Sequence, residues 1–210
     1  MKNNSQRQIK LTKFGLAAFH GPCKCNHSFT EILSIFRDFL SSHSREFLLV
    51  QVHREDSGSA KDKSISDKRF MDAFNQEISP LEKLIYNSDD DNPLIRDCRG
   101  KIILLLFKHV DDPQSLLKYR ILPVRKQWKS YTCRRTEAGI SEKLAAIEAG
   151  MRESLEHDGL FANECNAVGS TKFAQWIPNP REMAREINPS VKSLLSSSEF
   201  RGFSILLTQS

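Results

Sequence analysis

The chain has 210 residues, of which 39% are apolar and 27% charged, and its formal net charge at pH 7 is +5. This composition is ordinary for a globular protein of one domain, and five scattered cysteines exclude a regular disulfide framework. The mild positive charge suits an anionic partner, whether nucleic acid, a phosphorylated substrate or an acidic membrane surface, without choosing among them.

The N-terminal part of the chain predicts a strand followed by a helix. An apolar run at residues 14–19 stops at His20-Gly21-Pro22, and Ser28 with Glu31 three positions later is typical of a capping box at a helix start. Apolar residues then recur at helical spacing and predict one buried stripe: Phe29, Ile32, Leu33, Phe36, Phe39 and Leu40.

The next elements end in polar residues. Residues 46–52 (EFLLVQV) predict a buried strand that runs into His53 and Arg54, and residues 56–66 have the composition of a loop. A helix is predicted over residues 70–78, and residues 102–107, followed by Lys108, form the clearest strand pattern in the chain.

The C-terminal half continues the alternation of strands and helices. We predict strands near residues 125–131, over residues 160–168 and over residues 203–207. Ile140, Leu144, Ile147, Met151 and Leu155 mark an amphipathic helix. A further helix is predicted to start at Asn179-Pro180, and Pro189 is expected to interrupt it and begin a new one.

Strands that alternate with helices over this length favour an α/β domain with a largely parallel sheet, for which a barrel is the natural candidate. We find no glycine-rich phosphate loop, no G-x-S-x-G elbow and no H-E-x-x-H motif. Cys23, Cys25 and His27 alternate near His20, but a structural zinc normally needs four ligands, so separate thiols are favoured and no metal site is predicted.

Membrane contact is expected only at the surface of the bilayer. The basic N-terminus is not followed by an apolar stretch, so no signal peptide is predicted. The longest apolar run, residues 102–107, is too short to cross a bilayer.

Three segments, taken in order, resemble the bacterial phosphatidylinositol-specific phospholipases C. They are FHGP at residues 19–22 with the helix after it, RDCRGKIILLL at residues 96–106, and the passage from Pro180 through residues 186–189 (EINP) to residues 201–203 (RGF). The resemblance extends from about residue 5 to the end. It implies a distorted TIM-type barrel with its site at the C-terminal ends of the strands. It also implies that residues 1–210 are a single, partial catalytic domain lacking the first strand or strands, because the family's first catalytic histidine lies on an earlier strand.

The resemblance implies a metal-free internal phosphoryl transfer that uses two histidines and an arginine, with no cofactor. His20 matches the general acid. Arg7, thirteen positions earlier (20 − 7 = 13), matches the phosphate-binding arginine, although Ser5 replaces the usual aspartate two residues before it.

The inositol pocket departs from the family pattern at several positions. The pocket lysine falls at His53 beside Arg54, and the pocket arginine falls at Phe107 beside Lys108. The Asp-x-Tyr pair becomes Lys129-x-Tyr131, and the aspartate that orients a catalytic histidine falls at Gln209. These changes make the pocket more basic, and the residues expected to bind the headgroup are His53, Arg54, Lys108, Lys129 and Tyr131.

The first hypothesis is therefore cleavage of phosphatidylinositol-type lipids by attack of the inositol 2-hydroxyl, giving diacylglycerol and cyclic inositol phosphate. The expected partners are phosphatidylinositol or a related anionic lipid and the membrane surface, with no nucleic acid. A second hypothesis is a catalytically inactive relative that binds an anionic headgroup or a protein. A third is a glycerophosphodiester- or sphingomyelin-type phosphodiesterase, which would need paired carboxylates around a divalent metal. Nucleic-acid binding rests only on charge. The sequence leaves localisation open, although family members are often secreted.

Overall fold

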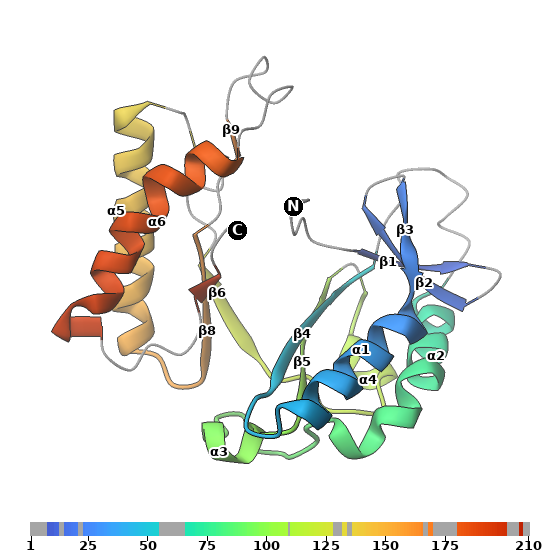
Figure 1. Cartoon of the computed structure of the whole chain (residues 1–210). Helices are drawn as coiled ribbons and strands as arrows, with labels where there is room; N and C mark the ends of the chain where they lie inside the picture. The colour runs from blue at the N-terminus through green and yellow to red at the C-terminus, as the bar shows by residue number, and fades with distance from the viewer. Residues whose placement is uncertain are drawn as a thin grey trace. The chain divides into compact units, whose positions relative to one another are not determined.

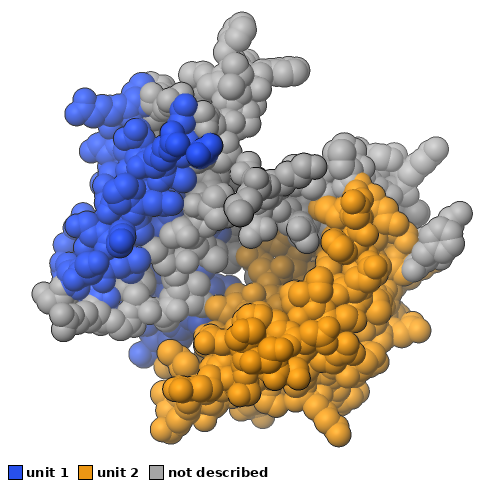
Figure 2. Space-filling model, in the orientation of Figure 1, with its two compact units in different colours: residues 1–4, 124–210 blue, residues 5–123 orange. Residues whose placement is uncertain are grey.

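A computed structural model describes residues 8–12, 15–20, 23–54, 66–108, 110–127, 132–133, 136–165, 168–169, 180–200 and 206–207. The chain separates into two compact units, which Figure 2 colours separately. Unit 2 comprises residues 5–123, and unit 1 comprises residues 1–4 and 124–210.

Unit 2 contains the first strands and helices of the chain (Figure 1). In chain order its elements are β1 Gln8–Thr12, β2 Gly15–His20, β3 Cys23–Ser28, α1 Phe29–Ser42, β4 Leu48–His53, α2 Asp67–Ile78, the 3-10 helix η2 Ser79–Leu84, α3 Ile95–Cys98, β5 Ile102–Lys108 and α4 Pro113–Leu116.

The strands of unit 2 form an antiparallel sheet and a parallel pair. β2 lies between β1 and β3 and runs antiparallel to both, whereas β4 and β5 run parallel. An isolated parallel bridge from Ile9 to Arg54 places β1 beside the end of β4. The prediction of a largely parallel sheet is therefore wrong for the N-terminal strands. A short connection can only reverse the chain, and a parallel neighbour would need a crossover of a dozen or more residues.

The core of unit 2 lies between these strands and the helices α1 and α2. The capping box at Ser28 and Glu31 is present, which confirms the predicted start of α1. Phe29 at that start packs against Phe74 of α2, with ring centroids 5.2 Å apart. Of the predicted stripe, Phe29, Leu33 and Leu40 are buried, whereas Phe39 is 37% exposed and stacks on His43.

Unit 1 contains β6 Val124–Gln127, β7 Thr132–Cys133, α5 Glu137–Leu155, β8 Leu160–Glu164, β9 Val168–Gly169, α6 Pro180–Ser196, the 3-10 helix η4 Ser198–Phe200 and β10 Leu206–Leu207. Its parallel sheet has the order β10-β8-β6, and β7 pairs in parallel with β9. Helices α5 and α6 share a core that includes Ile147, Met151, Met183, Ile187 and Val191.

The prediction that Pro189 begins a new helix is wrong, because α6 runs through it. Met183, Ile187 and Val191 recur at intervals of four and are all buried. An interior proline costs a helix about 3 kcal/mol. We attribute the continuity of α6 to this packed stripe, which holds the two halves as one element.

The architecture is α/β, as predicted, and it consists of small sheets. None of the sheets in the described residues closes into a barrel, which is consistent with an incomplete barrel. The single partial domain over residues 1–210 stays a prediction. No helix in the described residues is long and apolar enough to span a membrane.

Candidate functional site

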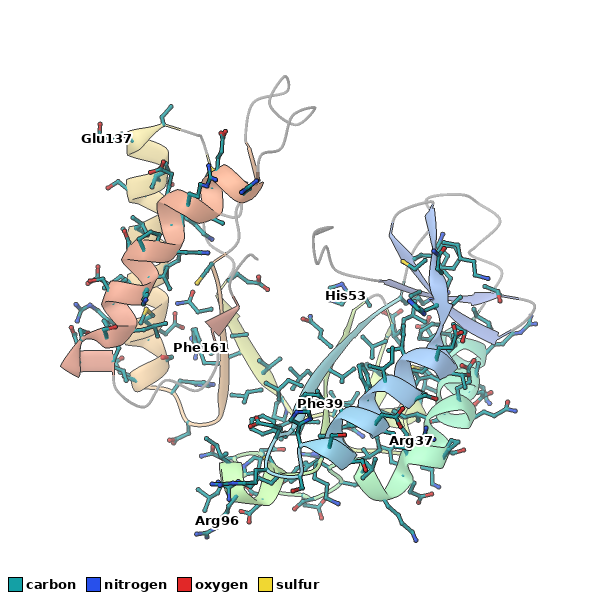
Figure 3. The ribbon with its side chains drawn as sticks, viewed as in Figure 1. Arg37, Phe39, His53, Arg96, Glu137 and Phe161 are labelled. Atoms are coloured by element: carbon teal, nitrogen blue, oxygen red, sulfur yellow. The ribbon has the colours of Figure 1, made fainter. Side chains whose placement is uncertain are left out.

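The C-terminal ends of β4 and β5 meet at one edge of unit 2. Their parallel register pairs Leu48 with Ile102 at one end and His53 with Lys108 at the other. The His53 side chain is only 5% exposed. Figure 3 shows His53 at the end of β4 that lies away from Arg96 of α3. In parallel sheets this edge is where ligands bind, so the polar residues here form the candidate site.

The β1–β2 hairpin brings the backbone of His20 back to the same edge. Ile9 of β1 is bridged to Arg54 on one side and paired with Ala18 of β2 on the other. Because β2 runs antiparallel to β1, the chain runs back along the sheet after the turn, and the backbone of His20 lies near the level of His53. Two strand spacings of about 4.8 Å then place these two backbones roughly 10 Å apart.

His20 is the last residue of β2 and pairs with Cys23 of β3, rather than following a strand of a parallel sheet. The side chain of His20 lies outside the described residues, as does that of Lys108.

Arg54 is held by a network that the sequence did not reveal. Its Nη1 donates to Oδ1 of Asp67, the first residue of α2, and its guanidinium lies 5.7 Å from the Phe70 ring centroid. Oδ2 of Asp67 accepts a hydrogen bond from the Asp111 backbone N–H at 2.8 Å. The only sequence signal for Asp67 was its place after Ser66, which caps α2.

Arg7, Lys129, Tyr131 and Gln209 lie outside the described residues. The structure thus brings His53, Arg54 and Lys108 together, with the backbone of His20 near them. Their roles stay predictions.

A shallow polar cavity of about 660 Å³ lies where β3 meets α1, and its lining includes Lys24, His27 and Glu31. It is a poor anion site, although helix N-termini often bind anions. The Ser28 hydroxyl already accepts from the Glu31 N–H, and the Glu31 carboxylate accepts from the Ser28 N–H at 2.6 Å. This backbone hydrogen bond lowers the pKa of Glu31, so the lining holds an ionised carboxylate at neutral pH that offsets the charge of Lys24.

Within the described ranges, no three His, Cys, Asp or Glu side chains gather as they would around a metal ion.

Comparisons with known proteins support the resemblance seen in the sequence. The 1-phosphatidylinositol phosphodiesterase of Listeria monocytogenes is 24% identical over an alignment that covers 93% of this chain and 60% of that protein. The chain therefore spans about three fifths of the length of that relative. No protein-family model matches the chain.

The fold agrees with solved structures of the same group. The phosphatidylinositol-specific phospholipase C from Listeria monocytogenes matches with a TM-score of 0.69 at 20% identity, covering 96% of this chain and 72% of that one. A Staphylococcus aureus phosphatidylinositol-specific phospholipase C matches with a TM-score of 0.65 at 16% identity, with the same two coverages. The chain is thus similar to bacterial phosphatidylinositol-specific phospholipases C in sequence and in fold.

Proposed function

We propose that this protein acts on phosphatidylinositol-type lipids at a membrane surface as a phosphodiesterase. The inositol 2-hydroxyl oxygen attacks phosphorus, a new O–P bond forms, and the bond from phosphorus to the diacylglycerol oxygen breaks. The products are cyclic inositol phosphate and diacylglycerol. The hydroxyl proton passes to a general base, and a general acid protonates the leaving oxygen, so the reaction needs no external co-substrate.

One observation carries this proposal: the strand register brings the end of β4, the end of β5 and the backbone of His20 to one edge. His53 and Lys108 occupy paired positions there, and histidine and lysine suit a headgroup with an anionic phosphate. The likeness to a phosphatidylinositol phosphodiesterase over 93% of the chain supports the same substrate.

In this mechanism His20 is the general acid, and Arg7 neutralises charge that develops on the phosphoryl oxygens. His53 and Lys108, at the ends of β4 and β5, bind the headgroup; the binding roles of Lys129 and Tyr131 stay predictions from the resemblance. The sequence has no histidine before His20, so the base histidine of the resembled family has no counterpart in these 210 residues. A general base contributes about 10²–10⁴-fold, so these 210 residues by themselves are expected to turn over slowly.

The test is release of cyclic inositol phosphate from vesicles that contain phosphatidylinositol. We expect slow release that His20→Ala abolishes, while His43→Ala, at an exposed histidine that follows α1, leaves it unchanged. Release that survives His20→Ala would refute the assignment of the acid.

A catalytically inactive headgroup-binding protein is the second candidate. Phe107, Lys129 and Gln209 replace residues that the resembled family uses in its pocket and to orient a histidine. This candidate predicts vesicle binding that depends on phosphatidylinositol, without product. Absence of both binding and product would reject both candidates.

A further inference from the structure

The cluster around Arg54 joins separate segments at the site edge. Arg54 follows β4, Asp67 begins α2, and Asp111 lies three residues after the end of β5. The Asp67 carboxylate links all three, because it accepts from the Arg54 guanidinium with one oxygen and from the Asp111 N–H with the other. The bridge from Ile9 adds β1 as a fourth segment.

The charge of Arg54 is compensated within the protein. Its side chain is 11% exposed and that of Asp67 is 28% exposed, so solvent screens this pair less than the surface pairs of the chain. The Arg54 guanidinium also lies over the ring of Phe70, which is almost fully buried. One N–H of the guanidinium is already donated to the Asp67 carboxylate and the charge is already compensated, so a phosphate gains less from Arg54 than from an unpaired cation, and drawing Arg54 away would leave the partly buried Asp67 unneutralised.

The contacts of Arg54 also set the position of its neighbour. His53 is the preceding residue and ends β4 opposite Lys108. Fixing Arg54 to α2 and to the segment after β5 restricts the backbone at both strand ends. Displacement of a binding group by about 1 Å can cost on the order of 10²-fold in rate.

We infer that Arg54 is a positioning residue, which acts through its ion pair with Asp67 to hold His53 at the site edge, and that it is not itself a headgroup ligand. The inference rests on the proposed function only for its activity readout, since the position of His53 can be measured without substrate.

The experiment is a double-mutant cycle in the full chain with Arg54→Gln, Asp67→Asn and the double variant. Asparagine at position 67 can still accept from the Asp111 N–H, so the change removes mainly the charge. We expect each single variant to reduce the rate of cyclic inositol phosphate release by about 10-fold, and the double variant to lose no more than either. Arg54→Lys, which keeps the charge pair, should retain most of the rate. If Arg54 bound the headgroup directly, Arg54→Gln would reduce the rate far more than Asp67→Asn, and the two reductions in rate would multiply in the double variant.

The substrate-free readout is the imidazole NMR signal of His53, assigned with His53→Gln. Asp67→Asn and Arg54→Gln should shift this signal to a similar extent, whether or not the protein turns over lipid. An Asp67→Asn protein whose His53 signal is unmoved overturns the inference. The exposed pair of Lys118 with Glu82 provides the matched control, and Lys118→Gln with Glu82→Gln should leave the His53 signal and the rate unchanged.

Discussion

Replacement of Gly15 by alanine tests how the hairpin that carries His20 is anchored. Gly15 begins β2 and has a φ of +101°, a conformation that L side chains rarely adopt. An added Cβ would lie 2.8 Å from Oε1 of Glu77. That same oxygen accepts a hydrogen bond from the Leu16 N–H at 2.6 Å, and Oε2 accepts from the Thr30 hydroxyl at 3.1 Å.

The magnitude has two parts. Forcing a residue with a Cβ into this backbone region costs about 1–3 kcal/mol. Moving the Glu77 carboxylate away weakens a charge-assisted hydrogen bond worth about 1.5–3 kcal/mol. We therefore expect Gly15→Ala to lower the free energy of unfolding by about 2.5–6 kcal/mol, which is a fall in Tm of about 5–24 °C for a chain of this size.

Urea and thermal unfolding of Gly15→Ala, Glu77→Ala and the double variant separate the two parts. In the Glu77→Ala background the clash is gone, so Gly15→Ala should cost only the backbone part, about 1–3 kcal/mol. An equal cost in both backgrounds would refute the steric argument. A cost below about 1 kcal/mol in the unmodified protein would refute the backbone argument as well.

Three further predictions concern caps and buried thiols. Ser28→Ala should lower the free energy of unfolding by about 1 kcal/mol in urea titrations, and by more than Ser66→Ala, because Ser28 belongs to a reciprocal capping box. The Ser28 N–H lowers the pKa of Glu31 below 4.5. The stabilisation of the folded state by the ionised Glu31 carboxylate is therefore present above pH 4.5 and is lost as the pH falls through the folded-state pKa. Glu31→Gln should flatten the acid limb of a Tm–pH curve. Burial raises the pKa of Cys165 from 9.0 to about 12, so the folded state disfavours the thiolate. The free energy of unfolding should then fall between pH 9 and 12 by up to about 1.4 kcal/mol per pH unit, and Cys165→Ala should remove this component.

Local sequence signals predicted the elements whose formation depends on nearby residues. The S-x-x-E pattern at Ser28 predicted the start of α1, and the apolar runs before His53 and Lys108 predicted β4 and β5 to within about two residues at each end. Capping and strand burial are set by a few adjacent side chains, so a single sequence is enough to read them.

Tertiary contacts decided the features that the sequence did not predict. The apolar stripe of α5 was expected to bury Leu155, yet Leu155 is 51% exposed, while Lys143 is fully buried. A lysine can lie inside because its Nζ donates to the Glu164 carbonyl at 2.7 Å. β1 was missed even though Ile9 and Leu11 alternate with polar residues, because five residues give too short a pattern to separate a strand from a loop.

The distinction between local sequence signals and tertiary contacts also explains which features of the candidate site could be predicted. Chain order predicted which residues follow strands, but only strand pairing determines how far apart they lie. The hairpin brings His20 to the edge because Ile9 pairs with Ala18 and bridges to Arg54. Successive side chains of a strand point to opposite faces, so a slip of β2 by one residue would turn His20 to the other face of the sheet. Glu77 accepts from the N–H of Leu16, the second residue of β2, and thereby ties the strand to α2 at one defined position. We therefore expect the contact between Glu77 and Leu16 to help fix the register that brings the backbone of His20 to the edge, although neither residue lies at that edge.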